Sequence, residues 1–433
     1  MSQITIGLIG IGVLFLLMFL RMPIGFAMAL VGFVGLIYLG SLDGALYFMG
    51  METFSNISNY NLSVLPLFML MSQFAFRSGI SEKLFGTAHK WLGHLPGGLA
   101  MATVAGCAGF GAICGSGIAT AMTFGPVVLP EMKKYNYEPG LATGSIAAGG
   151  TLAILIPPSS LFIVYGIITQ QSIGKLFIAG AFPGIVLASL FMITIFILVK
   201  RNPNLARSTP AVSIREKLAS LQGIGETLIL FLLVMGGLYG GIFTANEAAG
   251  VGAAGALLIG LARRRFTWEG FISAFVETVK TTGMVFVIII GAMIFNRFLA
   301  LTRIPNALVG IAGGLSIPPL ATIAVIVVIY MVLGALFDEL AITFLTVPIF
   351  FPVILAQGID PIWFGVIFCI CMEMGMILPP VGINVFVIAG VAKDVPMYTI
   401  YRGIGPFIIP MVITIGILMA FPQLALFLPS HMK

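Results

Sequence analysis

The stretch Leu155-Ile156-Pro157-Pro158 has a close copy, Ile377-Leu378-Pro379-Pro380, 222 positions later in the chain. Three further pairs of prolines recur at the same spacing: Pro96 with Pro318, Pro126 with Pro348, and Pro130 with Pro352. Proline removes a backbone donor and breaks helices, which is costly in lipid because the freed carbonyl groups find no water there. Matching helix breaks in two halves of a chain predict an internal repeat with a binding site at the breaks.

The composition is that of a protein embedded in a bilayer. Hydrophobic residues make up 59% of the chain and charged residues 8%, with a mean hydropathy of +1.13. A soluble domain is about one quarter charged and could not bury this much apolar surface. The runs 4–20, 228–243 and 404–421 are long enough to be bilayer spans. We therefore predict an all-α polytopic membrane protein, in which residues 4–20 form a retained helix because no basic residue precedes them.

The charge and the reactive residues exclude several other classes. Cytoplasmic loops collect Lys and Arg, which explains the net charge of +6 without a nucleic-acid partner. The four cysteines lack the His or carboxylate neighbours of a metal site, and none of the three histidines lies near a candidate nucleophile. The sequence has no phosphate-binding loop of the Gly-x-x-x-x-Gly-Lys-Ser/Thr type, which argues against ATP as the energy source. We expect a protein that is not an enzyme.

The distribution of basic residues predicts the topology. The densest basic stretch, residues 200–217, falls in the most polar connection of the chain, and the positive-inside rule places it in the cytoplasm. This linker, 201–225, separates a first repeat, 1–200, from a second repeat, 226–433. Residues 263–265 (Arg-Arg-Arg) return to the same side two helices later, whereas Arg21 has an uncharged counterpart in the second half, residues 243–246. We infer that the two halves are inserted with opposite orientation and that both termini are periplasmic.

Two segments interrupt the apolar sequence just before the paired Pro-x-x-x-Pro motifs. They are residues 115–120 in the first half and residues 337–343 in the second. We expect each to form the tip of a re-entrant hairpin, followed by a helix that unwinds at its Pro-Pro step. Unwound backbone offers carbonyl oxygens to a hard cation such as Na⁺, and the N-terminus of a half-helix favours an anion. The predicted architecture is an inverted repeat with two re-entrant hairpins and two unwound Pro-Pro helices.

A few polar side chains lie within these membrane segments. Asp338, Glu339 and Glu373 are carboxylates, which are costly in a membrane and usually functional there. The alternative is that Glu339 or Glu373 lies at an aqueous edge or satisfies a helix N-terminus. Ser116 and Thr120 are candidate cation ligands, although such hydroxyls also bond to the carbonyl groups of their own helix.

Five stretches resemble the large membrane subunit of tripartite ATP-independent periplasmic (TRAP) transporters: residues 21–27, 115–120, 149–159, 241–249 and 379–387. The resemblance runs in the right order through nearly the whole chain. It implies an elevator-type transporter of the bacterial inner membrane, with a scaffold and a mobile transport domain, driven by Na⁺. It also implies a small membrane subunit and a periplasmic substrate-binding protein as partners, and a small organic anion as the substrate.

The resemblance, carried over position by position, implies two Na⁺ sites. The first Na⁺ set is Ser116, Thr120, Gly150, Ala153, Ile156, Pro157 and Pro158. The second Na⁺ set is Asp338, Thr343, Gly375, Leu378, Pro379 and Pro380. The candidate substrate residues are Ser159, Glu339 and Asn384, whose amide group can bind a carboxylate or simply pack. Ala153 stands where the family often has Gly, and Leu378 stands where it often has Thr, so the second site lacks one hydroxyl.

We predict Na⁺-coupled uptake of a small organic anion, such as a C4-dicarboxylate, a sialic or other sugar acid, or a sulfonate. A stand-alone divalent anion/Na⁺ symporter shares the inverted repeat and the hairpins, but it would not require a binding protein. A membrane-embedded enzyme acting on a lipid-linked substrate would need a paired acid and base in a polar loop. The longest polar loop, residues 201–222, lacks such a pair.

Overall fold

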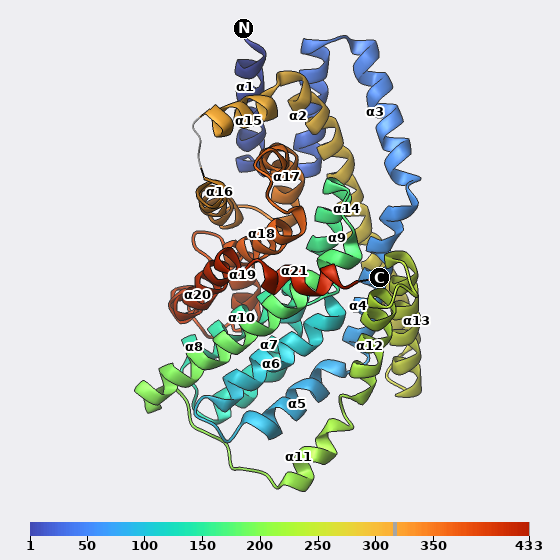
Figure 1. Cartoon of the computed structure of the whole chain (residues 1–433). Coiled ribbons are helices and arrows are strands. Elements are labelled where there is room, and N and C mark those ends of the chain that lie inside the picture. The colour runs from blue at the N-terminus through green and yellow to red at the C-terminus, as the bar shows by residue number, and fades with distance from the viewer. Residues whose placement is uncertain (315–317, 433) are drawn as a thin grey trace.

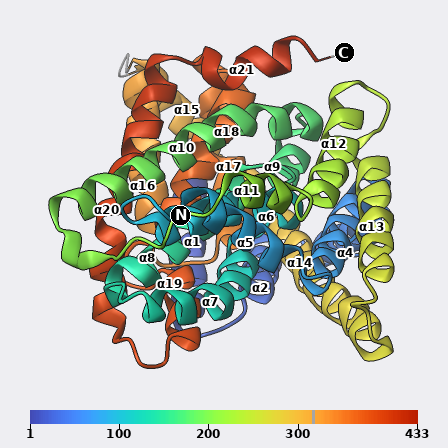
Figure 2. The same ribbon diagram turned by 90° about the horizontal axis from the view of Figure 1, so that it is seen from below.

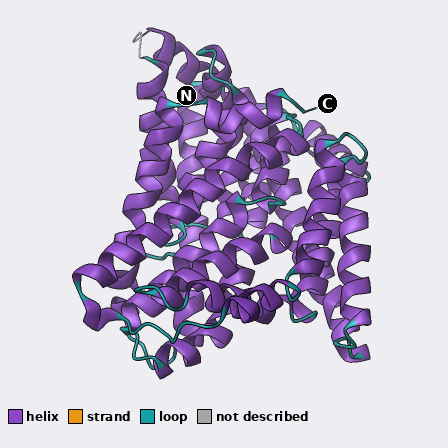
Figure 3. Cartoon of the chain, turned by 60° about the horizontal axis from the view of Figure 1, so that its bottom comes forward, coloured by secondary structure: helices purple, strands orange, loops and turns teal. Residues whose placement is uncertain are grey.

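The computed structural model describes residues 1–314 and 318–432, which form helices joined by short loops (Figures 1 and 3). No strand occurs within these described residues. The helices of the first half are α1 (Gln3–Phe19), α2 (Ile24–Leu39), α3 (Leu42–Ile57), α4 (Val64–Arg77), α5 (Ile80–Leu92), α6 (Gly98–Cys114), α7 (Gly117–Lys134), α8 (Pro139–Leu155), α9 (Ser160–Thr169) and α10 (Ile173–Arg201), with the 3₁₀ helix η1 (Tyr60–Ser63) before α4. After η2 (Pro203–Leu205) and α11 (Ile214–Leu221) follow α12 (Gly225–Tyr239), α13 (Ala245–Ala262), α14 (Trp268–Thr302), α15 (Ile304–Gly314), α16 (Pro319–Gly334), α17 (Glu339–Ala356), α18 (Pro361–Gly375), α19 (Ile383–Val391), α20 (Met397–Ala420) and α21 (Gln423–Ser430).

Several of these helices are suited to a bilayer. Within the described residues, six spans are long and apolar enough to cross a membrane, and up to eight result if each of two bent helix pairs counts as one span. A complete crossing needs about 20 residues. The helices α6, α16 and α18 have only 17, 16 and 15 residues, which suits hairpins and broken spans better than complete crossings. The prediction of an all-helical polytopic membrane protein is confirmed.

The helices of the two halves have matching bounds. The helices α7 and α17 both have 18 residues, and α17 begins and ends 222 positions after α7. The first residue of α18 also lies 222 positions after the first residue of α8, and the last residue of α19 lies 222 positions after the last residue of α9. Both α8 and α18 start with a proline at the first helical position, where the missing N–H would have had no partner within the helix. The division of the chain into a first repeat, 1–200, and a second repeat, 226–433, stays a prediction, which the matching helix bounds support.

Helices from one half pack against helices from the other. The helix α2 packs along α14 and α4 along α13, while α7 contacts α19 and α9 contacts α17. Small residues permit these close approaches: Gly25 of α2 meets the backbone at Gly291 of α14, and Gly144 of α8 meets Gly403 of α20. Seen from below, α4, α12 and α13 lie on one side of the molecule and α8, α19 and α20 on the other (Figure 2).

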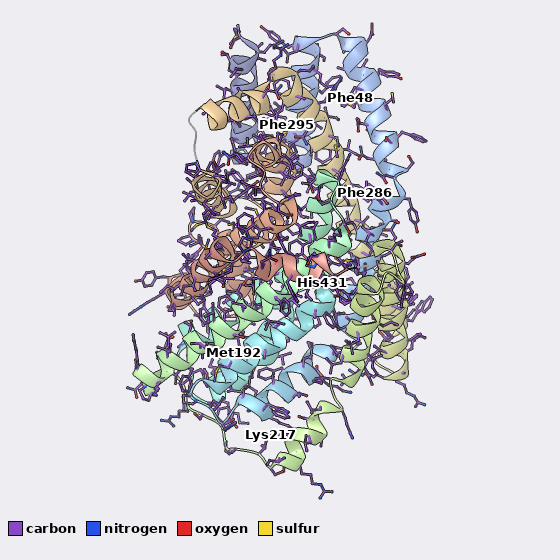
Figure 4. All side chains as sticks on the ribbon, viewed as in Figure 1. Phe48, Met192, Lys217, Phe286, Phe295 and His431 are labelled. Atoms are coloured by element: carbon purple, nitrogen blue, oxygen red, sulfur yellow. The ribbon has the colours of Figure 1, made fainter. Side chains whose placement is uncertain are left out.

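The linker contains a short helix that the sequence did not lead us to expect. The Ser213 hydroxyl accepts a hydrogen bond from the backbone N–H of Glu216 (3.3 Å) and so caps α11. The helix lies at the opposite end of the molecule from α3, as the labelled Lys217 and Phe48 show (Figure 4). The Thr87 hydroxyl of α5 donates to a carbonyl group of α11 (2.9 Å), which fixes the linker to the first half.

Large apolar side chains remain exposed on several helices. Leu8 of α1, Phe54 of α3, Leu232 of α12 and Val279 of α14 are 60–75% exposed. Such a surface is unfavourable in water, but lipid chains cover it without cost. These helices therefore present lipid-facing sides.

Candidate substrate and cation site

The tip of the first hairpin lies between α6 and α7. The chain turns at Gly115, which has φ +62°, a conformation that favours glycine. The next residue, Ser116, accepts a hydrogen bond from the backbone N–H of Ala119 (3.4 Å) and caps α7. A Cβ on Gly115 would collide with the carbonyl oxygen of Pro158, so the hairpin tip touches the first Pro-Pro step directly.

The first helix break joins α8 to α9. The helix α8 ends at Leu155, Ile156 is extended, and the peptide bond between Pro157 and Pro158 is cis. Ser159 then accepts from the backbone of α9 (3.3 Å) and caps that helix. The first residue of α9 donates to the carbonyl oxygen of the hairpin tip through its hydroxyl (3.0 Å) and its N–H (3.3 Å). These bonds hold the tip and the break together.

The second hairpin tip has a carboxylate where the first has a hydroxyl. One oxygen of Asp338 accepts hydrogen bonds from the N–H groups of Leu340 (3.0 Å) and Ala341 (3.3 Å), and it caps α17. Close to this tip, Gly334 at the end of α16 crosses Gly375 at the end of α18, with their backbones in contact. Only glycine permits this approach, which brings the hairpin against the second break.

The second helix break joins α18 to α19. The peptide bond between Pro379 and Pro380 is cis, and the N–H of Val381 donates to a carbonyl group of the hairpin loop, that of Ala335 (3.1 Å). The helix α19 begins after Gly382, which has φ +54°. The second hairpin and break are thus hydrogen-bonded to each other as the first pair is.

A cavity of about 330 Å³ lies where the two tips approach α4 and α14. From the hairpins and the first break, its walls include Ser116, Pro158, Ser159, Asp338 and Glu339. Residues that the sequence places more than 170 positions apart therefore meet at one cavity. Its volume lies near the lower end of the range for small-molecule sites.

The three candidate substrate residues do not all lie at this cavity. Ser159 and Glu339 line it, whereas Asn384 is not among the described residues of its wall. Asn384 is fully buried on α19, and a Cβ built on Gly150 would lie 3.7 Å from its amide nitrogen. Neither polar atom of the Asn384 amide has a hydrogen-bond partner among the described residues. Its position is therefore beside the first Na⁺ set.

The other residues of the first Na⁺ set surround the first tip and break. Thr120 is fully buried, and its hydroxyl has no hydrogen-bond partner within the described residues. A Cβ on Gly150 would lie 3.1 Å from the carbonyl oxygen of Gly117, so α8 and α7 cross closely there. Ala153 packs against α6. The Thr120 hydroxyl and the backbone carbonyl groups where α7 crosses α8 are hard oxygen donors, which suit Na⁺.

The oxygen donors of the second Na⁺ set are arranged differently from those of the first. The hydroxyl of Thr343 donates to the carbonyl oxygen of Glu339 one turn earlier (2.6 Å), so it is engaged within its own helix. The carbonyl oxygen of Leu378 lies 2.9 Å from the position of a Cβ on Gly382, at the inside of the turn that follows the Pro-Pro step. Of this set, Asp338 and the backbone carbonyl groups of the break are the donors best suited to a cation.

Glu339 and Glu373 form a buried pair. Their side chains contact each other through the two carboxyl groups, and the residues are 7% and 1% exposed. Both glutamates are thus buried, Glu339 at the cavity wall and Glu373 behind it, and Asp338 caps the N-terminus of α17 beside them. No ion pair within the described residues includes Asp338 or either glutamate.

The sequence analysis did not predict that α4 and α14 contribute to the wall of the cavity. Ser72 and Gln73 of α4 and Thr278 and Thr281 of α14 also line the cavity. The Ser72 hydroxyl lies 2.8 Å from the thiol of Cys114, at the end of the first hairpin helix. Pairs of polar residues inside otherwise apolar helices were the available signal, because such residues in membranes usually face the protein interior.

The donor atoms around the cavity do not suit a transition metal. No group of three or more His, Cys, Asp or Glu side chains is placed to hold a metal ion within the described residues. Hydroxyl, carboxylate and carbonyl oxygens are instead the ligands of hard cations.

Comparison with known proteins identifies the family. The model of the tripartite ATP-independent periplasmic transporter, DctM component, matches residues 11–424. The sialic acid TRAP transporter large permease protein SiaM of Vibrio cholerae is 32% identical, over 96% of both chains. The C4-dicarboxylate large permease protein DctM of Pseudomonas aeruginosa is 34% identical, over 88% of this chain and 89% of the relative. The ectoine large permease protein TeaC of Halomonas elongata is 30% identical, over 95% of this chain and 96% of the relative.

A solved structure supports the fold at greater evolutionary distance. The YdaH transporter of Alcanivorax borkumensis superposes with a TM-score of 0.64 over 89% of this chain and 90% of that one, with 16% sequence identity. The relatives are named as transporter permeases rather than enzymes. The chain is therefore a multi-pass membrane transporter protein, and it belongs to the family of the DctM component, the large permease, of tripartite ATP-independent periplasmic transporters.

Proposed function

We propose that this chain is the translocating subunit of a Na⁺-coupled, binding-protein-dependent uptake system for a small organic acid. The observation that carries the proposal is the cavity that both hairpin tips and the first Pro-Pro break line together. A transporter must release its substrate to either side, and a site built from two hairpin tips can open at one tip or the other. The relatives named for sialic acid and C4-dicarboxylates support an acidic substrate.

The acidic group of the substrate would bind where two helices begin. Ser116, which the family resemblance places in the first Na⁺ set, caps α7, and Ser159 caps α9. Both serines line the cavity, and we assign Ser116 to the substrate as well. Each serine oxygen accepts a hydrogen bond from its helix, which leaves the hydroxyl hydrogen free to donate to an anion. The N-terminal ends of the two helices also carry partial positive charge. A carboxylate or a sulfonate fits this arrangement.

Two Na⁺ ions would bind at the junctions of tip and break. In the first half, the fully buried Thr120 hydroxyl without a partner and the carbonyl groups near Gly150 are available. In the second half, Asp338 and the carbonyl groups near Leu378 are available. Cation binding would draw each tip against its break and so complete the walls of the substrate site.

The remaining parts of the proposal follow from the family and from the charge pattern. Both hairpins would be re-entrant and would move with α8, α9, α18 and α19 as an elevator past a scaffold that includes α2, α4, α13 and α14. The cytoplasmic side would carry the linker, and both termini would be periplasmic in the bacterial inner membrane. A small membrane subunit would complete the scaffold, and a periplasmic protein would deliver the substrate.

Uptake into proteoliposomes that contain the chain and its small subunit tests the proposal. We expect accumulation of substrate only with both an inward Na⁺ gradient and the cognate binding protein. Accumulation without the binding protein would favour a stand-alone divalent anion/Na⁺ symporter. Accumulation that is indifferent to Na⁺ would contradict the cation sites.

A further inference from the structure

An apolar groove separate from the substrate cavity lies between α5, α6 and α12. Its volume is about 550 Å³, and it shares no described wall residue with the cavity. One face of each helix forms a wall, because the lining residues recur three or four positions apart. Charged side chains are absent from the wall residues that the structure describes. The walls include Leu84 and Ala88 of α5, Ala105 and Gly109 of α6, and Leu228 and Phe231 of α12.

The linker helix α11, whose last residue Leu221 lines the groove, forms one rim of it. The indole N–H of Trp91, which lines the groove on α5, donates to the carbonyl oxygen of Lys217 (3.1 Å), a residue labelled in Figure 4. Lys83 lies at the same rim, because a Cβ on Gly223, in the turn between α11 and α12, would be 3.7 Å from its side chain. Two lysines therefore belong to the rim of an apolar groove.

The positive charge at this rim is not neutralised within the protein. Lys83 and Lys217 form no ion pair within the described residues. The neighbouring acidic residues Glu82 and Glu226 are each paired with an arginine of the segment 263–265. The helix α11 itself carries two basic residues and one acidic residue. The rim therefore complements an anionic group.

The groove also has features of a membrane–water interface. Tryptophan is enriched at such interfaces, and Trp91 is 40% exposed. Thr227, near the start of α12, lines the groove, and its buried hydroxyl has no hydrogen-bond partner within the described residues. An acceptor inside the groove, such as the ester carbonyl of a lipid, would satisfy this hydroxyl. In the proposed topology the linker faces the cytoplasm, and basic pockets between membrane helices on that side bind anionic lipid headgroups.

The volume of the groove matches one acyl chain better than a protein helix. A methylene group takes up about 30 Å³, close to the share of a water molecule in the liquid, so a chain of about 16 carbons needs roughly 480 Å³. An α-helix with its side chains is about 10 Å wide and rises about 5.4 Å per turn, so the groove would hold little more than one turn. The groove therefore suits a lipid tail rather than a neighbouring helix.

We propose that this groove binds one anionic phospholipid of the cytoplasmic leaflet. One acyl chain lies against α5, α6 and α12, the ester groups lie at Thr227, and the phosphate lies at the rim of Lys83 and Lys217. The inference goes beyond the proposed uptake function and takes from it only the side of the membrane on which the linker lies. Because α6 belongs to the first hairpin and α12 packs on α13, the lipid lies between the proposed mobile and fixed parts.

Native mass spectrometry of the chain with its small subunit tests the proposal. The complex is freed of lipid in detergent and titrated with phosphatidylglycerol or with phosphatidylcholine of the same acyl chains. A lysine near the membrane surface contributes about a factor of five in affinity for an anionic lipid, so the first phosphatidylglycerol should bind at least about fivefold more tightly than the first phosphatidylcholine. Lys83→Gln should weaken the binding of phosphatidylglycerol about fivefold. Lys200→Gln, at an exposed position near the end of α10, is the matched control and should leave it unchanged.

Two further variants fill the groove from opposite walls. Ala88→Phe on α5 and Ala105→Phe on α6 should each remove the tightest phosphatidylglycerol site. The second variant keeps the test decisive where the first does not fold. Gly86→Phe, on α5 but outside the groove wall and with open space around it, is the matched control and should retain the site.

Three results would overturn the inference. The first is equal affinity for the two lipids, and the second is binding of phosphatidylglycerol that both filling variants leave unchanged. The third is binding by the chain alone but not by its complex with the small subunit, which would assign the groove to that subunit. The titration contains no Na⁺ gradient, substrate or binding protein, so its outcome is independent of whether the proposed uptake function holds.

Discussion

Asp338 has two roles in this account, and two substitutions separate them. Its carboxylate caps α17 through two backbone N–H groups, at 3.0 and 3.3 Å, and we assign it to the second Na⁺ site. Asp338→Asn keeps an oxygen that can cap the helix but removes the charge. Asp338→Ala removes both the cap and the charge.

The expected magnitudes differ for the two roles. Loss of a capping side chain costs about 1 kcal/mol, and asparagine caps as well as aspartate, so only Asp338→Ala should lower the melting temperature. A hydrogen bond or ligand contact of a charged group is stronger than that of a neutral group by about 1.4 kcal/mol, which corresponds to a factor of about ten in affinity. Both variants should therefore raise the half-saturating Na⁺ concentration for uptake about tenfold.

The assay is uptake at saturating substrate with Na⁺ varied at constant ionic strength, combined with thermal melts of the same preparations. The contrast between the variants carries the information, because a purely structural role predicts a normal Na⁺ dependence for Asp338→Asn. Unchanged Na⁺ half-saturation in Asp338→Asn would refute the ligand assignment. A melting temperature for Asp338→Ala equal to that of the wild type would refute the cap.

Three further predictions concern packing, a buried hydroxyl and a surface ion pair. Gly375→Ala should lower stability by about 1–3 kcal/mol, because its Cβ would meet the backbone of Gly334, whereas Gly416→Ala, with open space around it, should keep or raise the melting temperature. Equal melting temperatures for these two variants would contradict the close crossing. Thr120→Val should be at least as stable as the wild type without Na⁺, because it removes a buried hydroxyl that has no partner, and it should lose part of the stabilisation by Na⁺. Full retention of that stabilisation would remove Thr120 from the site. Lys133 on α7 donates a hydrogen bond to Asp394 (2.7 Å) and holds the pKa of that carboxyl below its ordinary value. The ion pair is therefore intact above the ordinary pKa and is lost as the pH falls through the lowered pKa. The effect of Asp394→Asn on the melting temperature should then be constant between about pH 6 and pH 8, and a marked change across this range would contradict the assignment of the pair.

Much of the architecture could be predicted from the sequence because the physics of the membrane restricts it. Proline pairs at one constant spacing predicted the two helix breaks, and α8 and α18 end just before those prolines. The glycine and polar residues before each Pro-x-x-x-Pro motif predicted the two turns, which lie at Gly115 and between α16 and α17. In both cases a local rule about the backbone determined the result.

The walls of the site depended on contacts that no local rule describes. Gln73 and Thr278 reach the cavity because α4 and α14 pack beside the hairpin tips, and this packing is set by the whole helix arrangement. The contact between Glu339 and Glu373 has the same origin, since the two residues lie on α17 and α18. The position of Asn384 away from the cavity wall likewise follows from how α19 crosses α7 and α8. The linker helix α11 is a smaller omission, for which Ser213 with Glu216 three residues later was the available signal.

The central claim is that the two junctions of hairpin tip and helix break bind Na⁺. Thermal or denaturant stability of the purified chain with its small subunit, measured against Na⁺ concentration in a constant background of K⁺ or choline, tests this claim most directly. Each bound ion stabilises the folded state by RT ln(1 + [Na⁺]/Kd), so above the dissociation constants two ions should add about 2.8 kcal/mol per tenfold increase in Na⁺. A slope near that value, which Asp338→Asn reaches only at about tenfold higher Na⁺, is the result that the account predicts. Stability that responds equally to Na⁺ and K⁺, or to neither, would contradict it.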